Sequence, residues 1–325
     1  MKNKKYKLIV ALCLVAALFC LAACGGGSSE SDDSVRLIMA TGGTGGTYYP
    51  FGGALAQTIS TATDYIRINV NASGASAENV QLIGSGQAHL AIVQNDVMDY
   101  AFNATNTWTS DAVTNMRTLM SLYPEVCQIV VTADSGITSV ADLEGKRVST
   151  GDVGSGVEAN AAQILAAYGL SFSDLRQEHL GFSPSADAMR DNAIDAFFVT
   201  AGVPNTAIMD LQNSRDIRIL NLSDAAVDAL IADYAFYSRT VLTSDDYSFI
   251  DDPVNTVSVR ATLIATPDLD EQVAYDIVKA ILENIDEITL AHARGAYLSP
   301  ENAILGISVQ LHPGARRYFQ EIGVL

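Results

Sequence analysis

Thr41-Gly42-Gly43-Thr44-Gly45-Gly46-Thr47-Tyr48-Tyr49-Pro50 is the stretch of sequence that decides the fold. It follows a short apolar run at residues 35–40, which is typical of a buried strand, and it opens a predicted helix over residues 50–60. Glycine lets a backbone approach a ligand closely, and the free amide N–H groups at a helix start attract anions. The stretch therefore predicts a strand, a glycine-rich loop and a helix start suited to a small anion.

This first glycine loop differs from the familiar nucleotide-binding loops. It lacks the Gly-Lys-Ser/Thr ending of a P-loop, and Tyr48 stands where the dinucleotide fingerprint needs its third glycine. Two interpretations stay open. The loop is either a tight turn between a strand and a helix, or a cradle in which the amides of Gly45, Gly46 and Thr47 hold a carboxylate and Tyr48 and Tyr49 form the wall.

A second glycine loop, Gly154-Ser155-Gly156-Val157, precedes a predicted helix over residues 157–168. Apolar residues recur at helical spacing in that segment, and Gly169 suits the position just after its last turn. Ser155 can offer a hydroxyl group and an N–H group to a ligand, while the plainer interpretation is a helix cap. Two such helix starts that face each other predict a cleft for a ligand with acidic ends.

Strands and helices alternate along the rest of the chain, which predicts an α/β fold with two lobes. The predicted strands are residues 35–40, 65–70, 89–93, 117–121, 128–131, 196–200 and 217–220, and the predicted helices are 50–60, 78–84, 96–102 and 157–168. Residues 254–265 alternate with a period of two, which predicts a strand long enough to cross between lobes. Thr266 and Pro267 predict the start of a long helix after it, and residues 311–325 predict a closing helix.

The N-terminus has the features of an exported lipoprotein. Residues 1–23 combine basic residues with a short apolar run, and they end in Leu21-Ala22-Ala23-Cys24, which resembles a bacterial lipobox. Cys24 is then the lipid anchor to the membrane, and the polar residues 24–34 are a flexible tether. The alternative is an ordinary signal-peptide cleavage site. The apolar run is shorter than the roughly 20 residues of a membrane span.

Charge and cysteine content exclude several classes of protein. The formal net charge of −18 over 325 residues argues against binding to nucleic acid. Outside the signal peptide and Cys24, Cys127 is the one remaining cysteine, and its apolar surroundings predict a small core residue without a disulfide partner.

Catalytic patterns are missing from the sequence. Gly74-Ala75-Ser76-Ala77-Glu78 is a near miss for the nucleophile elbow, because Glu78 replaces its second glycine. The four histidines are scattered and form no zinc-binding pair. The sequence therefore predicts no enzyme activity, no cofactor and no metal. Arg260 has two open interpretations, a charge facing the ligand or part of an ion pair at the surface or between the lobes.

Several stretches together resemble the TAXI family, the solute receptors of one class of tripartite ATP-independent periplasmic (TRAP) transporters. The resemblance rests on the first glycine loop, Ala75-Ser76-Ala77-Glu78-Asn79, Ala91-Ile92-Val93-Gln94-Asn95-Asp96, Leu122-Tyr123-Pro124-Glu125, the loop at 154–156, and Asp195-Ala196-Phe197-Phe198 with Gly202 and Pro204. It covers residues 35–325.

The resemblance implies a type II-like periplasmic-binding-protein fold, in which each lobe is a sheet flanked by helices and crossing hinge strands join the lobes. Lobe 1 then comprises residues 35–125 and 262–325, and lobe 2 comprises residues 126–261. A receptor of this family does no catalysis. It captures a small carboxylate outside the cytoplasm, here glutamate, glutamine or a related acid, and delivers it to the membrane permease subunits of a TRAP transporter driven by an ion gradient.

The resemblance also implies which residues bind the ligand. They are Gly45, Gly46, Thr47, Tyr48, Ser76, Asn79, Gln94, Asn95, Tyr123, Glu125, Ser155, Gly156 and Val157. One departure is Asp152, because a proline or serine is expected just ahead of the second loop. Asp152 either grips an ammonium group of the ligand or is a solvated loop residue, and both interpretations stay open.

Three alternatives to this function remain. The first has the same fold and is an ABC-transporter receptor for a sulfonate or a similar anion. The second is a lipid-anchored hydrolase with Ser76 or Ser155 as its nucleophile. The third is an adhesive surface antigen whose cleft binds nothing.

Overall fold

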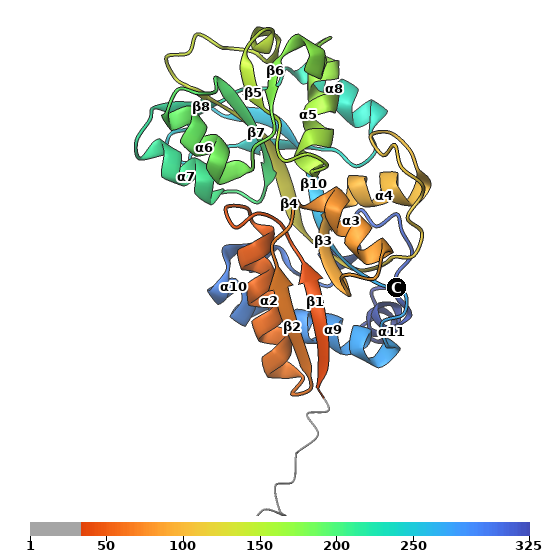
Figure 1. Cartoon of the computed structure of the whole chain (residues 1–325). Helices are drawn as coiled ribbons and strands as arrows, with labels where there is room; N and C mark the ends of the chain where they lie inside the picture. The colour runs from red at the N-terminus through yellow and green to blue at the C-terminus, as the bar shows by residue number, and fades with distance from the viewer. Residues whose placement is uncertain (1–33) are drawn as a thin grey trace, which may run out of the picture. The chain divides into compact units, whose positions relative to one another are not determined.

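Two long antiparallel strands, β4 (Arg117–Thr132) and β10 (Val254–Ala265), run through the middle of the molecule (Figure 1). The computed structural model describes residues 34–325, so the predicted signal peptide, the Cys24 anchor and almost all of the tether lie outside the described residues. One end of β10, residues 261–265, pairs with a strand of one lobe, and the other end, residues 254–258, pairs with a strand of the other. This confirms the predicted crossing strand.

The strands predicted at residues 117–121 and 128–131 are one continuous strand. Pro124 lies between the two predicted segments, and proline cannot donate a hydrogen bond to a sheet. In the structure Pro124 lies opposite Arg260, where the pairing between β4 and β10 shifts its register, and proline is tolerated at such irregularities. Two uninterrupted strands therefore connect the lobes.

Lobe 1 is the half of the molecule that carries the parallel strands β2, β1 and β3 beside β10. Its elements are β1 (Val35–Ala40), α2 (Tyr48–Ala62), β2 (Ile66–Asn71), α3 (Ser76–Gly84), β3 (Leu90–Gln94), α4 (Asn95–Asn103), α9 (Glu271–Glu283), α10 (Ile285–Ala291), η3 (Ala293–Tyr297), η4 (Asn302–Ile304) and α11 (Pro313–Glu321). The helices bury apolar faces against the sheet, and Phe51, Leu55 and Ile59 of α2 are fully enclosed.

Lobe 2 is the half that extends the sheet from β4 through β7, β5 and β6, with β8 on β4 and β9 on β10. Its elements are η1 (Val140–Leu143), β5 (Arg147–Ser149), α5 (Gly156–Ala167), η2 (Phe172–Asp174), β6 (Arg176–Glu178), α6 (Phe182–Arg190), β7 (Ala196–Ala201), α7 (Thr206–Gln212), β8 (Ile217–Ile219), α8 (Asp224–Asp233) and β9 (Ser238–Leu242). Cys127 is a buried member of this lobe's core, as predicted.

The helix that follows β10 starts later than predicted. Thr266 and Pro267 belong to a turn in which Leu269 N–H donates to Thr266 O, and α9 begins only at Glu271. Asp270 caps it, because its carboxylate accepts from the amides of Gln272 and Val273 at 2.8 and 3.1 Å. The predicted long helix is also interrupted at Asn284, and a separate helix α10 follows. The closing helix is the shorter α11.

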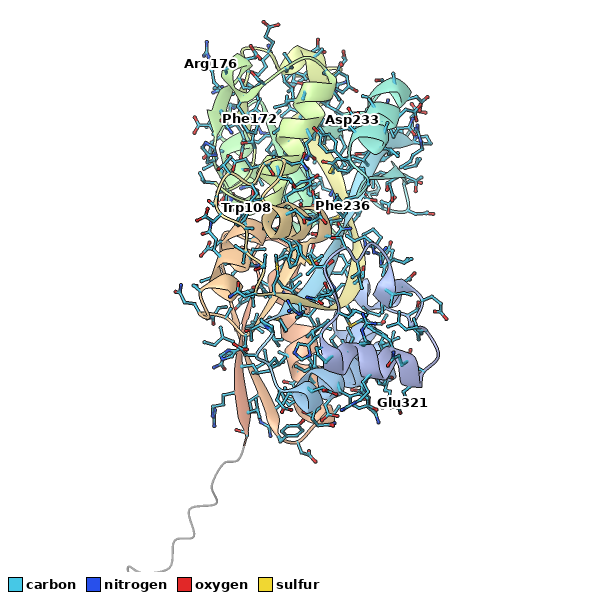
Figure 2. The ribbon with its side chains drawn as sticks, turned by 90° about the vertical axis from the view of Figure 1, so that its right-hand side faces the viewer. Trp108, Phe172, Arg176, Asp233, Phe236 and Glu321 are labelled. Atoms are coloured by element: carbon cyan, nitrogen blue, oxygen red, sulfur yellow. The ribbon has the colours of Figure 1, made fainter. Side chains whose placement is uncertain are left out.

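The lobes meet beside the crossing strands. Asn160 of α5 donates to the Asp96 carboxylate of α4 at 2.9 Å, and Gln163 donates to the Tyr100 hydroxyl at 3.1 Å. Phe236 of lobe 2 packs edge-on against Tyr100, with ring centroids 6.0 Å apart, and Figure 2 shows it at the boundary between the lobes. These contacts hold the two halves together around the space between them.

Within residues 34–325, no helix combines the length and apolarity that a membrane crossing requires. No cluster of metal-ligating side chains occurs in the same part of the chain.

Candidate functional site

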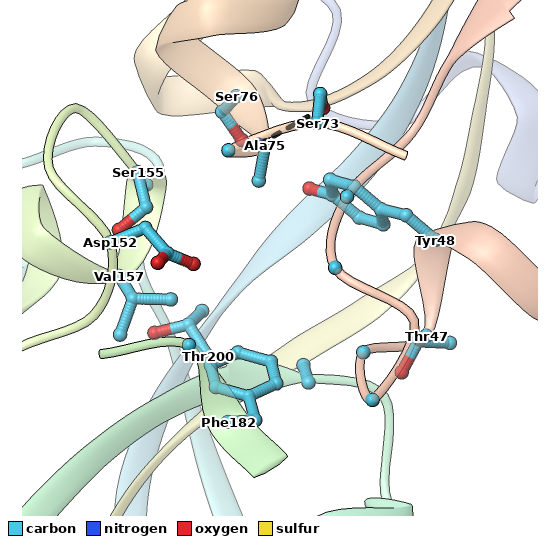
Figure 3. A pocket seen from close by; sticks show the side chains of 18 of the residues that line it. Thr47, Tyr48, Ser73, Ala75, Ser76, Asp152, Ser155, Val157, Phe182 and Thr200 are labelled. Atoms are coloured by element: carbon cyan, nitrogen blue, oxygen red, sulfur yellow. Dashed lines mark hydrogen bonds between the residues drawn. The ribbon is translucent and has the colours of Figure 1, made fainter. Parts of the chain in front are cut away.

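A cavity of about 420 Å³ lies between the lobes, where the two glycine loops meet (Figure 3). Lobe 1 lines it with Gly42, Gly43, Thr44, Gly45, Gly46, Thr47, Tyr48, Ser73, Gly74, Ala75, Ser76 and Gln94. The crossing strand β4 and lobe 2 line it with Glu125, Asp152, Ser155, Gly156, Val157, Gly181, Phe182, Ser183, Pro184, Thr200 and Ala201. Its size is that of a site for a small molecule.

In the described part of the chain, four helices begin at this cavity, α2 and α3 from lobe 1 and α5 and α6 from lobe 2. The first amides of a helix have no acceptor within the helix, and the helix dipole adds a partial positive charge there. Figure 3 shows Tyr48, Ser76, Ser155 and Phe182, one near the start of each helix, around the same space. The cavity is therefore surrounded by hydrogen-bond donors.

Some of the amides predicted to hold the ligand are already occupied. Gly46 N–H donates to Gly43 O at 2.9 Å, and Ser155 N–H donates to Asp152 O at 3.0 Å. Both bonds close the tight turns that the glycines permit, so these two amides are not available as predicted. The next amides of the same loop, those of Gly156 and Val157, have no acceptor among residues 34–325. The Ser155 side chain caps α5, since its hydroxyl accepts from the amide of Glu158 at 3.2 Å, and the helix still presents the two free amides of Gly156 and Val157.

Helix α6 contributes a second set of free donors that the sequence did not reveal. The amides of Phe182 and Ser183 lie in its first turn and have no acceptor among the described residues, while Ser185 N–H donates to Gly181 O. No helix was predicted here. The signal in the sequence is Ser183-Pro184, since proline is compatible with the first turn of a helix.

The charged side chains that line the cavity are both acids. Neither lysine nor arginine is among the lining residues that the structure describes. Burial and the nearby Glu78 carboxylate raise the pKa of Asp152 above its usual value. The groups on the described cavity wall that could hold an anion are therefore amides and hydroxyl groups.

Glu125 lies in the same cavity and is bonded to Tyr48. The Tyr48 hydroxyl donates to Glu125 Oε2 at 2.6 Å, and both groups are buried. Burial raises the pKa of Glu125 well above its usual value, although the bond from Tyr48 favours the ionised form. Burial also raises the pKa of Tyr48, so its hydroxyl keeps its proton.

The structure brings most of the predicted binding residues to the cavity wall. They are Gly45, Gly46, Thr47, Tyr48, Ser76, Gln94, Glu125, Ser155, Gly156 and Val157. Gln94 is notable among them because its Oε1 atom is buried and accepts no hydrogen bond from the described residues. Their contact with a ligand stays a prediction.

Three predicted residues, Asn79, Asn95 and Tyr123, do not line the cavity. Asn79 donates to Thr41 O and Ile92 O at 2.5 and 2.8 Å and ties the first glycine loop to β3. Asn95 accepts from the amide of Arg260 at 3.0 Å. The ring of Tyr123 packs edge-on against Phe51 with centroids 5.0 Å apart. All three are close to lining residues in sequence, but their side chains point into the protein interior.

Replacing Asn79 with alanine is expected to lower the free energy of unfolding by about 2–4 kcal/mol, because two buried carbonyl groups lose their donor. Urea unfolding of Asn79→Ala measures this loss. Asn213→Ala is the matched control: its side chain is exposed and bonds only Met209 O, so the change should stay within about 0.5 kcal/mol. Equal losses in the two variants would contradict a structural role for Asn79.

Arg260 satisfies neither interpretation of its role. It is absent from the cavity wall, and no carboxylate of the described residues lies within ion-pair distance of it. Its Nε atom donates to the Ser121 hydroxyl at 2.7 Å, and burial lowers its pKa. Arg260 of β10 thus connects the two crossing strands through its hydrogen bond to Ser121 of β4.

Two lobes around a cleft lined with hydrogen-bond donors define the class of two-lobed solute-binding proteins. Comparisons with known proteins agree with this class. The model of the NMT1-like family matches residues 39–323, and the chain belongs to this family.

Solved structures confirm the predicted fold. PhnD1 from Prochlorococcus marinus, solved with methylphosphonate, is similar with a TM-score of 0.54 and 12% identity over 91% of this chain and 100% of that one. A binding protein component of an ABC phosphonate transporter from Pseudomonas aeruginosa has a TM-score of 0.50 and 10% identity over 81% and 79%. The aliphatic sulphonate binding protein SsuA from Escherichia coli has a TM-score of 0.49 and 16% identity over 80% and 74%. The comparisons also agree with the prediction of a binding protein that is not an enzyme.

These findings correct the predicted TAXI membership and, with it, the TRAP permease and the preference for glutamate. The family found is the NMT1-like family, and two of the similar structures are PhnD1, solved with methylphosphonate, and a binding protein component of an ABC phosphonate transporter. The motifs behind the TAXI prediction are short loops at helix starts and short segments of the strands β3, β4 and β7. Such segments follow from the two-lobed fold, so they do not identify the class of transporter.

Proposed function

We propose that the chain is an extracytoplasmic receptor that captures a small organic oxyanion, a sulfonate or a phosphonate, and passes it to an ABC-type permease. The observation that carries the proposal is the meeting of four helix N-termini at one cavity without a lysine or arginine. The names of the structural relatives point to the same kind of solute. Anchoring through Cys24 remains a prediction from the sequence.

The placement of the donors around the cavity favours a tetrahedral oxyanion. Free amides lie at the starts of α5 and α6 in lobe 2, and Thr44 and Ser76, which carry hydroxyl groups, line the cavity from lobe 1. Three oxygen atoms on one centre can accept from several sides, whereas a planar carboxylate has only two. Each hydrogen bond to a charged group contributes about 1.5–3 kcal/mol, so four of them contribute about 6–12 kcal/mol before ordering costs are subtracted, a range that includes the roughly 8 kcal/mol of micromolar binding.

The cavity has room for more than the anionic group. Phe182, Val157 and Pro184 supply apolar wall on the side of lobe 2, and Ala75 does so from lobe 1. Apolar surface buried on binding adds about 25 cal/mol per Å². The proposed solute therefore has an organic body beside its charged head.

Binding is tested first with methanesulfonate and methylphosphonate, each compared with dimethyl sulfone, a neutral molecule of similar shape. A ligand at 100 times its Kd stabilises the protein by about 2.7 kcal/mol. We expect the two anions to raise the melting temperature and dimethyl sulfone to leave it unchanged. Equal responses to the neutral and charged molecules, or no response to any oxyanion, would overturn the proposed function.

A proline variant tests the amides directly. Val157→Pro removes one free N–H at the second residue of α5, where proline is tolerated, and is expected to weaken binding about 10-fold or more. Val157→Ala controls for the side chain. Ala225→Pro places the same change at the equivalent position of α8, away from the cavity, and should leave affinity unchanged. Equal affinity of Val157→Pro and Val157→Ala, measured by calorimetry, would contradict binding by the α5 amides.

A further inference from the structure

Glu125 is an acid in a site built to attract anions, which calls for an explanation. Its side chain is only 2% exposed and lines the cavity from β4. Oε2 accepts the Tyr48 hydroxyl proton at 2.6 Å, whereas Oε1 accepts no hydrogen bond from residues 34–325. One oxygen of the carboxyl group is thus fixed by the protein, and the other is left for whatever enters the cavity.

Among residues 34–325, no cationic side chain offsets a negative charge on Glu125. Four titratable groups interact electrostatically with Glu125. They are Tyr48 from α2, Asp96 from α4, and Tyr123 and Cys127 from β4 itself. Asp152 lies on the lobe 2 side of the same cavity. The charge of Arg294 interacts with Tyr123, but Arg294 is not among the groups that shift the pKa of Glu125. The surroundings are neutral or acidic, so the protonated form is favoured.

We propose that Glu125 binds the anion as a neutral carboxylic acid that donates a hydrogen bond from Oε1, so that ligand affinity is linked to protonation of this residue. The inference rests on the proposed function. Because the Tyr48 hydroxyl already donates to Oε2, the proton of the neutral acid is carried by Oε1. Ionisation turns this donor into a negatively charged acceptor, which repels an anion.

The linkage has a definite sign. Burial raises the pKa of Glu125, so the neutral form persists above the usual range of a glutamic acid. Once the pH exceeds this pKa, the fraction of neutral Glu125 falls tenfold for each pH unit. The dissociation constant of an anion rises by the same factor. The neutral acid therefore favours anions and disfavours solutes that present an ammonium group to Oε1.

Calorimetry with methanesulfonate tests the linkage, since the charge of this anion is constant from about pH 5 to pH 9. The wild type is expected to lose affinity up to tenfold per pH unit above the pKa of Glu125. Glu125→Gln keeps an N–H donor without a titrating proton, so it should bind with a flat pH profile, while Glu125→Ala should bind more weakly at every pH. A wild-type affinity that rises with pH, or the same slope in Glu125→Gln, would overturn the proposal.

A second measurement needs no ligand. A buried acid with a raised pKa destabilises the folded state increasingly as the pH rises above the value of about 4.3 found in unfolded chains. The melting temperature of Glu125→Gln relative to wild type should therefore increase with pH, whereas Glu144→Gln, at an exposed position, should track the wild type. A constant difference would overturn the neutral state of Glu125. Failure of the proposed function would look different, namely no methanesulfonate binding in any of the variants.

Discussion

Replacing Gly156 with alanine is expected to weaken anion binding about 100-fold. A Cβ atom at this position would lie 2.2 Å from Gln94 Oε1 and 2.3 Å from Gln94 Cδ, across the boundary between the lobes. Gln94 is buried, so its carboxamide group can retreat only into the cavity, or else the lobes must separate. Overpacking of this kind costs about 1–3 kcal/mol, and about 2.7 kcal/mol corresponds to 100-fold in affinity.

The double variant Gln94→Ala with Gly156→Ala separates this clash from other effects. Shortening Gln94 makes room for the new methyl group, so affinity should recover to that of Gln94→Ala alone. Gly53→Ala is a matched glycine control within α2, where a Cβ atom meets nothing within 4 Å. Calorimetry with methanesulfonate provides the affinities. Full affinity in Gly156→Ala alone would show that Gln94 and Gly156 do not limit closure.

Replacing Gly314 with alanine is expected to produce the largest loss of stability, about 3 kcal/mol or more. Gly314 lies in the first turn of α11, and a Cβ atom there would be 2.1 Å from Glu271 O and 2.7 Å from the amide nitrogen of Tyr275. Both are backbone atoms of α9, so no side-chain rotation relieves the contact. The two helices must move apart and expose part of the lobe 1 core.

Urea unfolding of Gly314→Ala checks this expectation, with Gly53→Ala as its control. The control should gain about 0.5–1 kcal/mol, because alanine favours a helix interior over glycine. A Gly314→Ala protein as stable as the wild type would mean that α11 is not held against α9 as the structure shows. Ligand affinity should be little affected, since Gly314 is not part of the cavity wall.

The sequence predicted the features that depend on neighbours along the chain. Glycine-rich loops between apolar strands and helices placed two helix starts at the cavity, and the alternation in residues 254–265 predicted a crossing strand. These predictions succeed because a glycine turn and a period-two strand are encoded locally.

Features that depend on contacts across the fold could not be predicted. The side chain of Asn79 turns inward, where it donates to the carbonyl groups of Thr41 and Ile92. The contribution of α6 depends on lobe 2 folding back toward the first loop, where Ser183 approaches Gly45. Motif position alone specifies none of these directions, because each is set by tertiary packing.

The resemblance to TAXI receptors predicted a class of transporter that its motifs do not specify. Loops such as 41–50 and 154–156 recur wherever a strand feeds a helix at an anion site, so they report the architecture.

The uninterrupted strands β4 and β10 have a mechanical consequence. Paired strands resist a sharp pivot, so separation of the lobes has to be distributed as twist and bend along both strands. The register of the pair shifts between Arg260 and Thr262 and again between Leu263 and Ile264, and bending is easiest at such irregularities. Opening the cleft would therefore strain the strand pair, and the strain would return the lobes to one relative geometry. A solute that prevents the cleft from closing fully would bind more weakly, because the strand pair stays strained and because contacts between solute and protein are missing.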